Sequence, residues 1–199
     1  MIRFLGKLPQ KCVVACSGGA DSMAVLSFLS NKSKRHITVA YFDHGTKFGS
    51  ESKQFLQDYC NQYNLPLVIN TIQESKPKNE SWEEYWRNQR YQFLHGFDLP
   101  VITAHNLNDQ METWLFTGFH GQPRLIPYQN RNVIRPFMLT PKSRLIEWCK
   151  SKNIPWLEDP SNQDTHFMRN KIRHDILPEV LKVNPGFDKV IFKKVLELI

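Results

Sequence analysis

A glycine turn flanked by hydroxyl groups carries the clearest chemical signal in the sequence. It reads Ser17-Gly18-Gly19-Ala20-Asp21-Ser22 and follows an apolar run at residues 12–16. Two glycines allow a tight turn in which several backbone N–H groups face one anion, and a helix starting there adds its positive dipole end. The hydroxyls of Ser17 and Ser22 can donate to phosphate oxygens, whereas Asp21 repels phosphate unless Mg²⁺ lies between them. The turn therefore predicts a site for a magnesium-bound nucleotide; a plain strand-to-helix turn is the alternative.

Other phosphate and metal signatures do not occur in the sequence. No G-x-x-x-x-G-K-S/T run is present, which excludes a Walker loop, and no G-x-G-x-x-G run, which excludes a dinucleotide fingerprint. The cysteines, at positions 12, 16, 60 and 149, form no C-x-x-C pair, which disfavours a zinc ribbon or a redox dithiol. We expect them to be buried thiols in a reducing cytosol.

Polar residues follow two further apolar runs. Phe42, Asp43 and His44 end the run at residues 37–42, and His105 follows the run at residues 100–104. If the next helix begins as early as residue 105, His105 and Asp109 share one of its faces. Such a pair can fix an imidazole tautomer or place a carboxylate on Mg²⁺, although a structural role is the alternative.

Charged residues later in the chain suggest contacts to anions and amines. Arg87 and Arg90 lie three positions apart, so they can grip phosphate or stack on a base, or they line a solvated helix face. We read Trp82 and Trp86 as core residues. The run from Glu158 to Asp164 is an acidic loop able to attract an amine, and the basic segment at residues 169–174 can hold RNA or a triphosphate.

The elements that position these residues alternate between short apolar runs and amphipathic segments. We predict strands at residues 12–16, 37–42, 67–69, 100–104 and 132–135, and helices at residues 21–29, 50–63, 82–95 and 107–116, from 141 onward and at 187–199. Ser50, a capping box at residues 81–84 and Thr140 are the expected helix caps. The alternation predicts a doubly wound α/β fold with a mainly parallel, five-stranded sheet and a short helical C-terminal appendage. We expect a catalytic domain at residues 1–140 and a helical extension at residues 141–199.

The composition narrows the partners and the location of the protein. A net charge of +7 and a pI near 9.3 suit a polyanionic partner, with most of the surplus after residue 130. Its longest apolar runs are too short to span a bilayer, and we expect neither a membrane partner nor a secretory signal. These features predict a cytoplasmic protein.

The glycine turn resembles the signature of the PP-loop ATP pyrophosphatases, which cleave ATP between the α and β phosphates and adenylate a substrate. With the remaining blocks in order, residues 13–178 resemble the tRNA(Ile)-lysidine synthetase family, most specifically in Glu158-Asp159-Pro160-Ser161-Asn162 paired with Arg169-Asn170. The resemblance implies two steps. ATP adenylates the wobble cytidine of a tRNA(Ile) with a CAU anticodon, and free lysine then displaces AMP to give lysidine.

The same resemblance assigns roles to individual residues. It implies that ATP is held by Ser17, Gly18, Gly19, Ala20, Asp21, Ser22, Phe42, Asp43 and His44, with Mg²⁺ on Asp21. It implies that adenylation uses His105 and Asp109, with Arg169 or Arg173 on the transferring phosphate. It implies that substrate or tRNA meets Arg87, Arg90, Glu158, Asp159 and Asn170.

The sequence departs from the family pattern at two positions of its central motif. The family usually reads His-His-x-Asp-Asp-Gln, whereas this chain has Asn106 and Asn108 in place of the second His and the first Asp. Two rival functions stay open. One is another PP-loop enzyme, such as a tRNA thiolase or an amide-forming synthetase, and the other is a tRNA-binding module with degraded catalysis.

Overall fold

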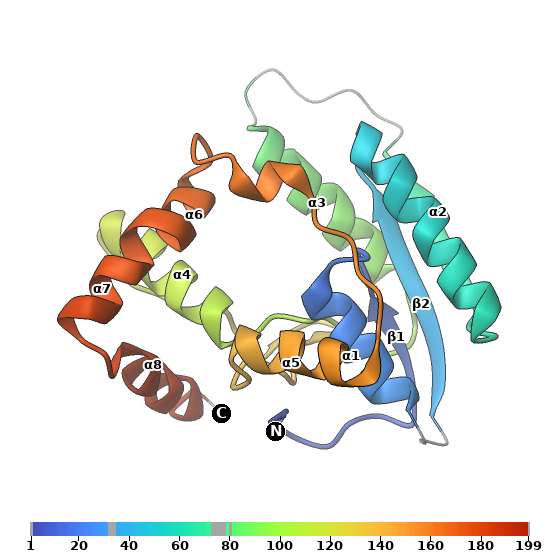
Figure 1. Ribbon diagram of the computed structural model, residues 1–199, viewed down its shortest axis with the longest axis horizontal. Helices are drawn as coiled ribbons and strands as arrows, with labels where there is room; N and C mark the ends of the chain where they lie inside the picture. Colours follow the sequence, from blue (N-terminus) through green and yellow to red (C-terminus); the bar gives the residue numbers. More distant parts are fainter. Residues whose placement is uncertain (1, 32–34, 73–78, 80, 199) are drawn as a thin grey trace.

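A single mainly parallel sheet forms the centre of the protein. The computed structural model describes residues 2–31, 35–72, 79 and 81–198 (Figure 1). The strands are β1 (Lys11–Ala15), β2 (His36–Asp43), β3 (Leu67–Thr71), β4 (Val101–Ile102), β5 (Gln129–Asn130) and β6 (Val133–Ile134). Their order is β3-β2-β1-β4-β6-β5, and only the β5–β6 pair is antiparallel. The α/β class is confirmed, but the sheet has six strands rather than five. The prediction missed β5 because both of its residues are exposed and show no apolar pattern.

The central strands are buried on both faces, which explains their continuous apolar runs. Val13 and Val101 pack into one core cluster, while their neighbours Val14 and Ile102 pack into another on the opposite face. Side chains alternate in this way because successive residues of a strand point to opposite faces. Both faces therefore need a helical cover.

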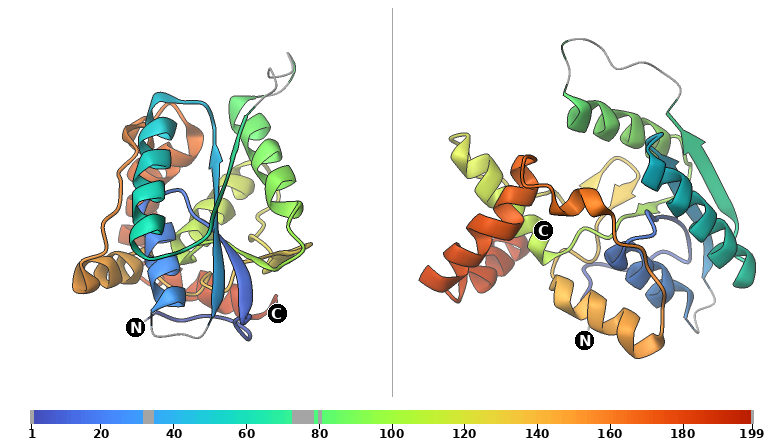
Figure 2. Two further views of the ribbon diagram at one scale, coloured as in Figure 1. Left: turned by 90° about the vertical axis from the view of Figure 1, so that its right-hand side faces the viewer. Right: turned by 45° about the horizontal axis from the view of Figure 1, so that its top comes forward.

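Helices supply that cover from both sides (Figure 2). The core cluster that contains Val14 and Ile102 also contains residues of α1 (Ala20–Ser30), α2 (Lys47–Gln62) and α5 (Lys142–Lys152). On the other face lies α3 (Trp82–His95), which contributes Leu94 and Phe93 to the cluster that contains Val13 and Val101. The doubly wound arrangement is thus present in the structure.

A second group of helices packs beside the sheet. It consists of α4 (Leu107–Phe119), the short α6 (Met168–Lys171), a π-helical turn η2 (Ile172–Ile176), α7 (Leu177–Val183) and α8 (Phe187–Leu196). Met111, Leu177 and Ile191 share an apolar cluster that joins α4, α7 and α8. By contrast, α5 packs on α1, where Trp148 Nε1 donates to Ser27 Oγ over 3.2 Å. The helices after residue 140 thus pack into two different apolar clusters.

Two helix starts differ from the predicted ones. Thr46, rather than Ser50, caps α2, since its hydroxyl accepts from the N–H of Gly49 at 3.0 Å. Thr140 does not cap α5. Its hydroxyl instead accepts from the N–H of Arg3 at 3.0 Å and donates to the carbonyl of the same residue. The Ser81 cap of α3 is confirmed by a 3.2 Å hydrogen bond from the N–H of Glu84.

The strand order reverses at one edge of the sheet. The chain runs outward from β1 to β3 and then returns to place β4 on the other side of β1. Open α/β sheets bind ligands where the strand order reverses, outside the carboxyl ends of the strands. The loops after β1 and β4 meet there. Within the described residues, no helix is long and apolar enough to cross a membrane.

A candidate nucleotide-binding site at the carboxyl edge of the sheet

The turn after β1 has the geometry of an anion cradle. Gly18 has a φ of +83°, which favours glycine, and Gly19 is the N-cap of α1, where no side chain caps the helix. The first N–H groups of α1 are therefore open to a ligand. Ser22 is buried and donates its hydroxyl to the Gly19 carbonyl over 2.9 Å, so it stabilises the turn. Ser17 is exposed at the rim, where its hydroxyl can meet a phosphate.

Asp21 presents a carboxylate oxygen that the protein leaves unused. Its Oδ2 lies 3.5 Å from Lys142 Nζ, whereas its Oδ1 is buried without a hydrogen-bond partner among the described residues. Burial raises the pKa of Asp21, and the charge of Lys142 opposes that rise. The described residues include no group of three His, Cys, Asp or Glu side chains that could hold a metal. One open carboxylate oxygen nevertheless fits Mg²⁺, which proteins often hold by one or two carboxylates plus substrate phosphates.

Arg173 pairs with a carboxylate that the sequence interpretation did not select. Its Nε and Nη2 donate to the two oxygens of Glu112, each over 2.8 Å. Glu112 is only 2% exposed, and these hydrogen bonds raise the pKa of Arg173. The pairing spans 61 positions in the chain. The available signal was the position of Glu112, three residues after Asp109 on the same helix.

His105 and Asp109 lie near one another in sequence but have different partners. The helix α4 begins at Leu107, so the condition for a shared face is not met. His105 Nδ1 lies 2.7 Å from the Thr103 hydroxyl. Asp109 Oδ2 accepts from the N–H of Asn106 at 2.8 Å and, with the Asn106 side chain, forms a capping box. Asn106 is therefore a helix cap in this chain.

The pKa values of these two side chains are shifted in opposite directions. Burial lowers the pKa of His105 to about 3, and the charges of four arginines add to this effect. Burial, and then the charge of Glu112, raises the pKa of Asp109 to about 7. The imidazole is consequently neutral at pH 7, while the carboxyl group is poised between its two protonation states.

Four guanidinium groups lie close enough to His105 for their charges to act on it. They belong to Arg87, Arg90, Arg135 and Arg169, and each lowers the pKa of His105. The first three place Cζ 5.7, 5.9 and 5.9 Å from the ring centroid of Tyr91, and Arg169 lies 5.6 Å from that of Phe116. Such a concentration of positive charge suits a polyphosphate or an RNA backbone.

Arg135 is the member of this group that the sequence interpretation missed. It is 2% exposed and donates to the Pro127 carbonyl and the Tyr91 hydroxyl, each over 2.8 Å. Its Nε is buried without a partner among the described residues. The only signal was its position at the end of the predicted strand at residues 132–135.

The residues after β2 and the acidic loop complete the same edge. Asp43 Oδ1 accepts from the N–H of Gly45 at 2.8 Å, while the His44 ring packs 5.1 Å from Phe42. Asp159 accepts from the N–H of Ser161 at 2.9 Å, and Glu158 is exposed.

Buried Asn170 tethers the acidic loop from within. Its side-chain nitrogen donates to the carbonyls of Ser161 and Asp164 over 2.8 and 2.9 Å. The structure therefore gives Asn170 a role inside the loop.

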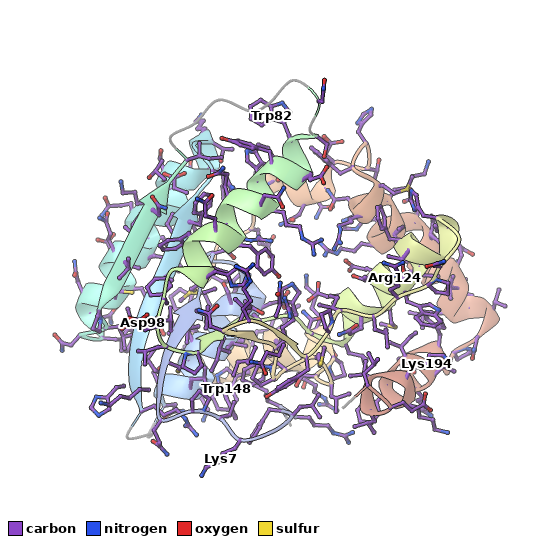
Figure 3. All side chains as sticks on the ribbon, turned by 180° about the vertical axis from the view of Figure 1, so that it is seen from behind. Lys7, Trp82, Asp98, Arg124, Trp148 and Lys194 are labelled. Atoms are coloured by element: carbon purple, nitrogen blue, oxygen red, sulfur yellow. The ribbon has the colours of Figure 1, made fainter. Side chains whose placement is uncertain are left out.

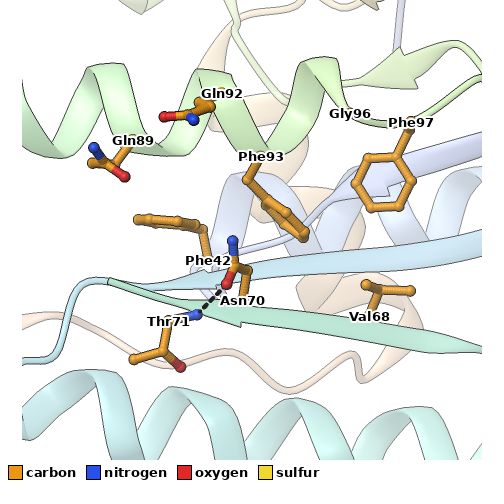
Figure 4. Close-up of a pocket in the computed structure, with 9 residues that line it drawn as sticks. All are labelled: Phe42, Val68, Asn70, Thr71, Gln89, Gln92, Phe93, Gly96 and Phe97. Carbon is orange, nitrogen blue, oxygen red and sulfur yellow. Dashed lines mark hydrogen bonds between the residues drawn. The ribbon is translucent and has the colours of Figure 1, made fainter. Parts of the chain in front are cut away.

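A separate pocket of about 440 Å³ opens between α3 and strands β2 and β3 (Figure 4). Its lining consists of Phe42, Val68, Asn70, Thr71, Gln89, Gln92, Phe93, Gly96 and Phe97. Only Phe42 among these belongs to the predicted site. The pocket is therefore distinct from the cradle after β1.

The sheet is mainly parallel, the glycine turn that can hold phosphate lies where the strand order reverses, and arginine side chains lie nearby. Together these features define a nucleotide-binding α/β protein. The chain belongs to the PP-loop domain family, whose sequence pattern matches residues 3–180.

Curated relatives in this family carry a common name. A tRNA(Ile)-lysidine synthase of Treponema denticola is 36% identical over 212 residues, covering 93% of this chain and 45% of the relative. Those of Enterococcus faecalis and Thermotoga maritima are 32% and 31% identical, covering 89% and 92% of this chain and 42% and 48% of the relatives. The chain thus spans about half the length of the curated relatives it matches.

A solved structure supports the fold alone. The NH3-dependent NAD synthetase from Campylobacter jejuni superposes with a TM-score of 0.51 at 16% identity, covering 97% of this chain and 87% of that one.

Proposed function

We propose that this chain forms lysidine on a tRNA(Ile) with a CAU anticodon, as a ligase that makes a carbon–nitrogen bond. The wobble cytidine oxygen attacks the α-phosphate of ATP and pyrophosphate leaves; the ε-amine of free L-lysine then displaces AMP. One observation carries the proposal: an anion cradle, four arginines and an acidic loop meet at one edge of the sheet. The names of the curated relatives support the choice of substrates. We place the reaction in the cytoplasm, whose reducing conditions suit four free, buried cysteines.

In the adenylation step, the protein's task is to stabilise negative charge. The open N–H groups at the start of α1 and the hydroxyl of Ser17 would hold phosphate oxygens. Asp21 would hold Mg²⁺, which when bound neutralises phosphate charge. Arg169 or Arg173 would neutralise the transferring phosphate. Arg169 is one of the four arginines whose charge acts on His105, and Arg173 is held by Glu112 through two hydrogen bonds.

In the lysine step, the protein must attract an ammonium ion and then remove a proton from it. The acidic side chains of Glu158 and Asp159 would attract the charged amine. His105 is a weak base in the free protein because its pKa lies near 3. Asp109, with a pKa of about 7, is better matched to accept the proton at neutral pH.

The test measures both products of the reaction. The chain is incubated with ATP, Mg²⁺, labelled lysine and the tRNA, and pyrophosphate release and label on the RNA are followed. We expect both signals with a wobble cytidine and neither with a wobble uridine. Asp21→Ala should abolish both, whereas Asp58→Ala, which alters an exposed carboxylate on α2, should change neither. Pyrophosphate without RNA labelling would indicate another adenylating enzyme, and RNA binding without pyrophosphate would indicate a binding module.

A further inference from the structure

A series of four neighbouring aromatic rings, tilted or edge-on to one another and termed the stack, leads from the surface to the end of β2. Ring centroids are 5.6 Å apart between Trp82 and Trp86, 5.6 Å between Trp86 and His44, and 5.1 Å between His44 and Phe42. Trp82 is 54% exposed and lies at the outer end of α3 (Figure 3). The stack therefore presents an aromatic face to solvent and ends beside the candidate nucleotide site.

Two ring nitrogens inside this stack have unmet hydrogen-bonding capacity. His44 Nδ1 and Trp86 Nε1 are both buried and lack a hydrogen-bond partner among the described residues. Buried polar atoms are normally hydrogen-bonded, so these two nitrogens are adjacent exceptions whose donor and acceptor capacity a bound group could use. The indole N–H can only donate, and a neutral imidazole nitrogen can donate or accept. The edge of a nucleobase offers both kinds of group.

A positively charged side chain follows the stack along α3. Trp82, Trp86 and Arg90 are spaced four residues apart and so share one helical face. The charge of Arg90 acts on His44, which places the guanidinium group near the inner end of the stack. Aromatic rings followed by a cation are the arrangement by which proteins hold single-stranded nucleic acid, since bases stack and phosphates pair with arginine.

We propose that Trp82, packed against Trp86 and through it against His44, forms a stacking site for one unpaired base of the substrate RNA. The inference rests on the proposed function and extends it from the reacting cytidine to a neighbouring nucleotide. RNA is favoured over the base of ATP because the outer ring faces solvent, whereas the cradle for the phosphates follows β1. The prediction that Trp82 is a core residue is wrong, because its side chain is 54% exposed, whereas Trp86 is partly buried.

The test measures binding of a fluorescein-labelled anticodon stem-loop with a CAU anticodon by fluorescence anisotropy at fixed salt. We expect Trp82→Ala to weaken binding about tenfold and Trp82→Phe to recover most of the loss, because every aromatic ring offers a face for stacking. Tyr63→Ala is the matched control. It removes a 49% exposed ring at the far end of α2 and should leave binding unchanged. Affinity for MgATP should be unchanged in all three variants.

A second series places one abasic site at each loop position of the same stem-loop. The effect of Trp82→Ala should vanish at a single position, which identifies the stacked base. Equal binding by wild type and Trp82→Ala would overturn the inference, and so would a loss confined to MgATP, which would assign the stack to the base of ATP. Equal RNA binding with normal lysine incorporation overturns this inference alone. Failure of the wild-type chain to bind the RNA overturns the proposed function as well.

Discussion

Leu157 donates its backbone N–H to the carbonyl of Gly18 over 2.9 Å, and Gly19 and Leu157 form an isolated parallel bridge. This contact ties the segment that precedes Glu158 to the glycine turn after β1. Residues about 140 positions apart in the chain thus meet at the cradle. The acidic loop consequently lies beside the candidate phosphate site.

The conformation of Gly18 predicts a difference between two neighbouring substitutions. Gly18→Ala should lower the free energy of unfolding by about 1–2 kcal/mol, because its φ of +83° is strained for an L-residue. Gly19→Ala is the control. Its φ is −77°, and an added Cβ would meet its nearest atoms at 3.6 and 3.9 Å, which is ordinary contact. Urea unfolding of both variants checks the prediction, and equal stability would contradict the observed turn geometry.

The buried pair of Glu112 and Arg173 predicts a loss of stability when one partner is removed. Glu112→Gln should lower the free energy of unfolding by about 2–3 kcal/mol, somewhat below the range for fully buried pairs because Arg173 is 27% exposed. Arg144→Gln, which breaks the exposed pair with Glu147, should cost less than about 1 kcal/mol. Chemical denaturation measures both. Similar losses from both variants would show that the buried pair is not special.

The lowered pKa of His105 predicts that the stability of the folded protein falls as the pH decreases. Its pKa is lowered to about 3 in the folded protein, so between pH 3 and the ordinary value of 6.5 only the unfolded chain binds the proton. Stability contributed by His105 is therefore complete above pH 6.5 and declines as the pH falls toward 3. NMR of labelled histidine should show no titration of His105 between pH 5 and 8. A midpoint near 6.5 would contradict the burial of the ring among arginines.

The raised pKa of Asp109 predicts the opposite, a contribution to stability that falls as the pH increases. Its pKa is raised to about 7, so between pH 3.8 and 7 the folded protein binds the proton more tightly than the unfolded chain. Its favourable contribution is present below pH 3.8 and is lost as the pH rises through 7. Asp109→Asn should remove this dependence and leave the protein at least as stable at pH 8, because an amide oxygen can still accept from Asn106. A large loss of stability at pH 8 would show that the ionised carboxylate is required.

The sheet could be predicted from sequence because its strands are buried on both faces. The apolar runs around Val13 and Val39 are most simply explained as buried strands, and the glycine turn after the first of them lies where the strand order reverses. Local rules failed where distant residues decide the outcome. Thr140 forms hydrogen bonds with Arg3 and does not cap its own helix. Glu112 pairs with Arg173, which lies 61 positions later in the chain.

The start of α2 shows a further limit of local patterns. The helix begins at Lys47, three residues before the predicted cap at Ser50. In the structure a Cβ at Gly49 would collide with Asp43 Oδ1, so glycine is needed there for packing while Thr46 supplies the cap. Sequence spacing alone does not reveal which side chain approaches a backbone.

The most direct test of the nucleotide cradle is calorimetric titration of the chain with ATP in the presence and absence of Mg²⁺. We expect wild type to bind MgATP, and Asp21→Ala to bind it at least about tenfold more weakly, since Asp21 Oδ1 would lose its place on the ion. Without Mg²⁺ the variant should bind ATP no more weakly than wild type, because a carboxylate repels phosphate. Equal affinity of wild type and Asp21→Ala for MgATP would show that the turn after β1 is not the site of the magnesium-bound nucleotide.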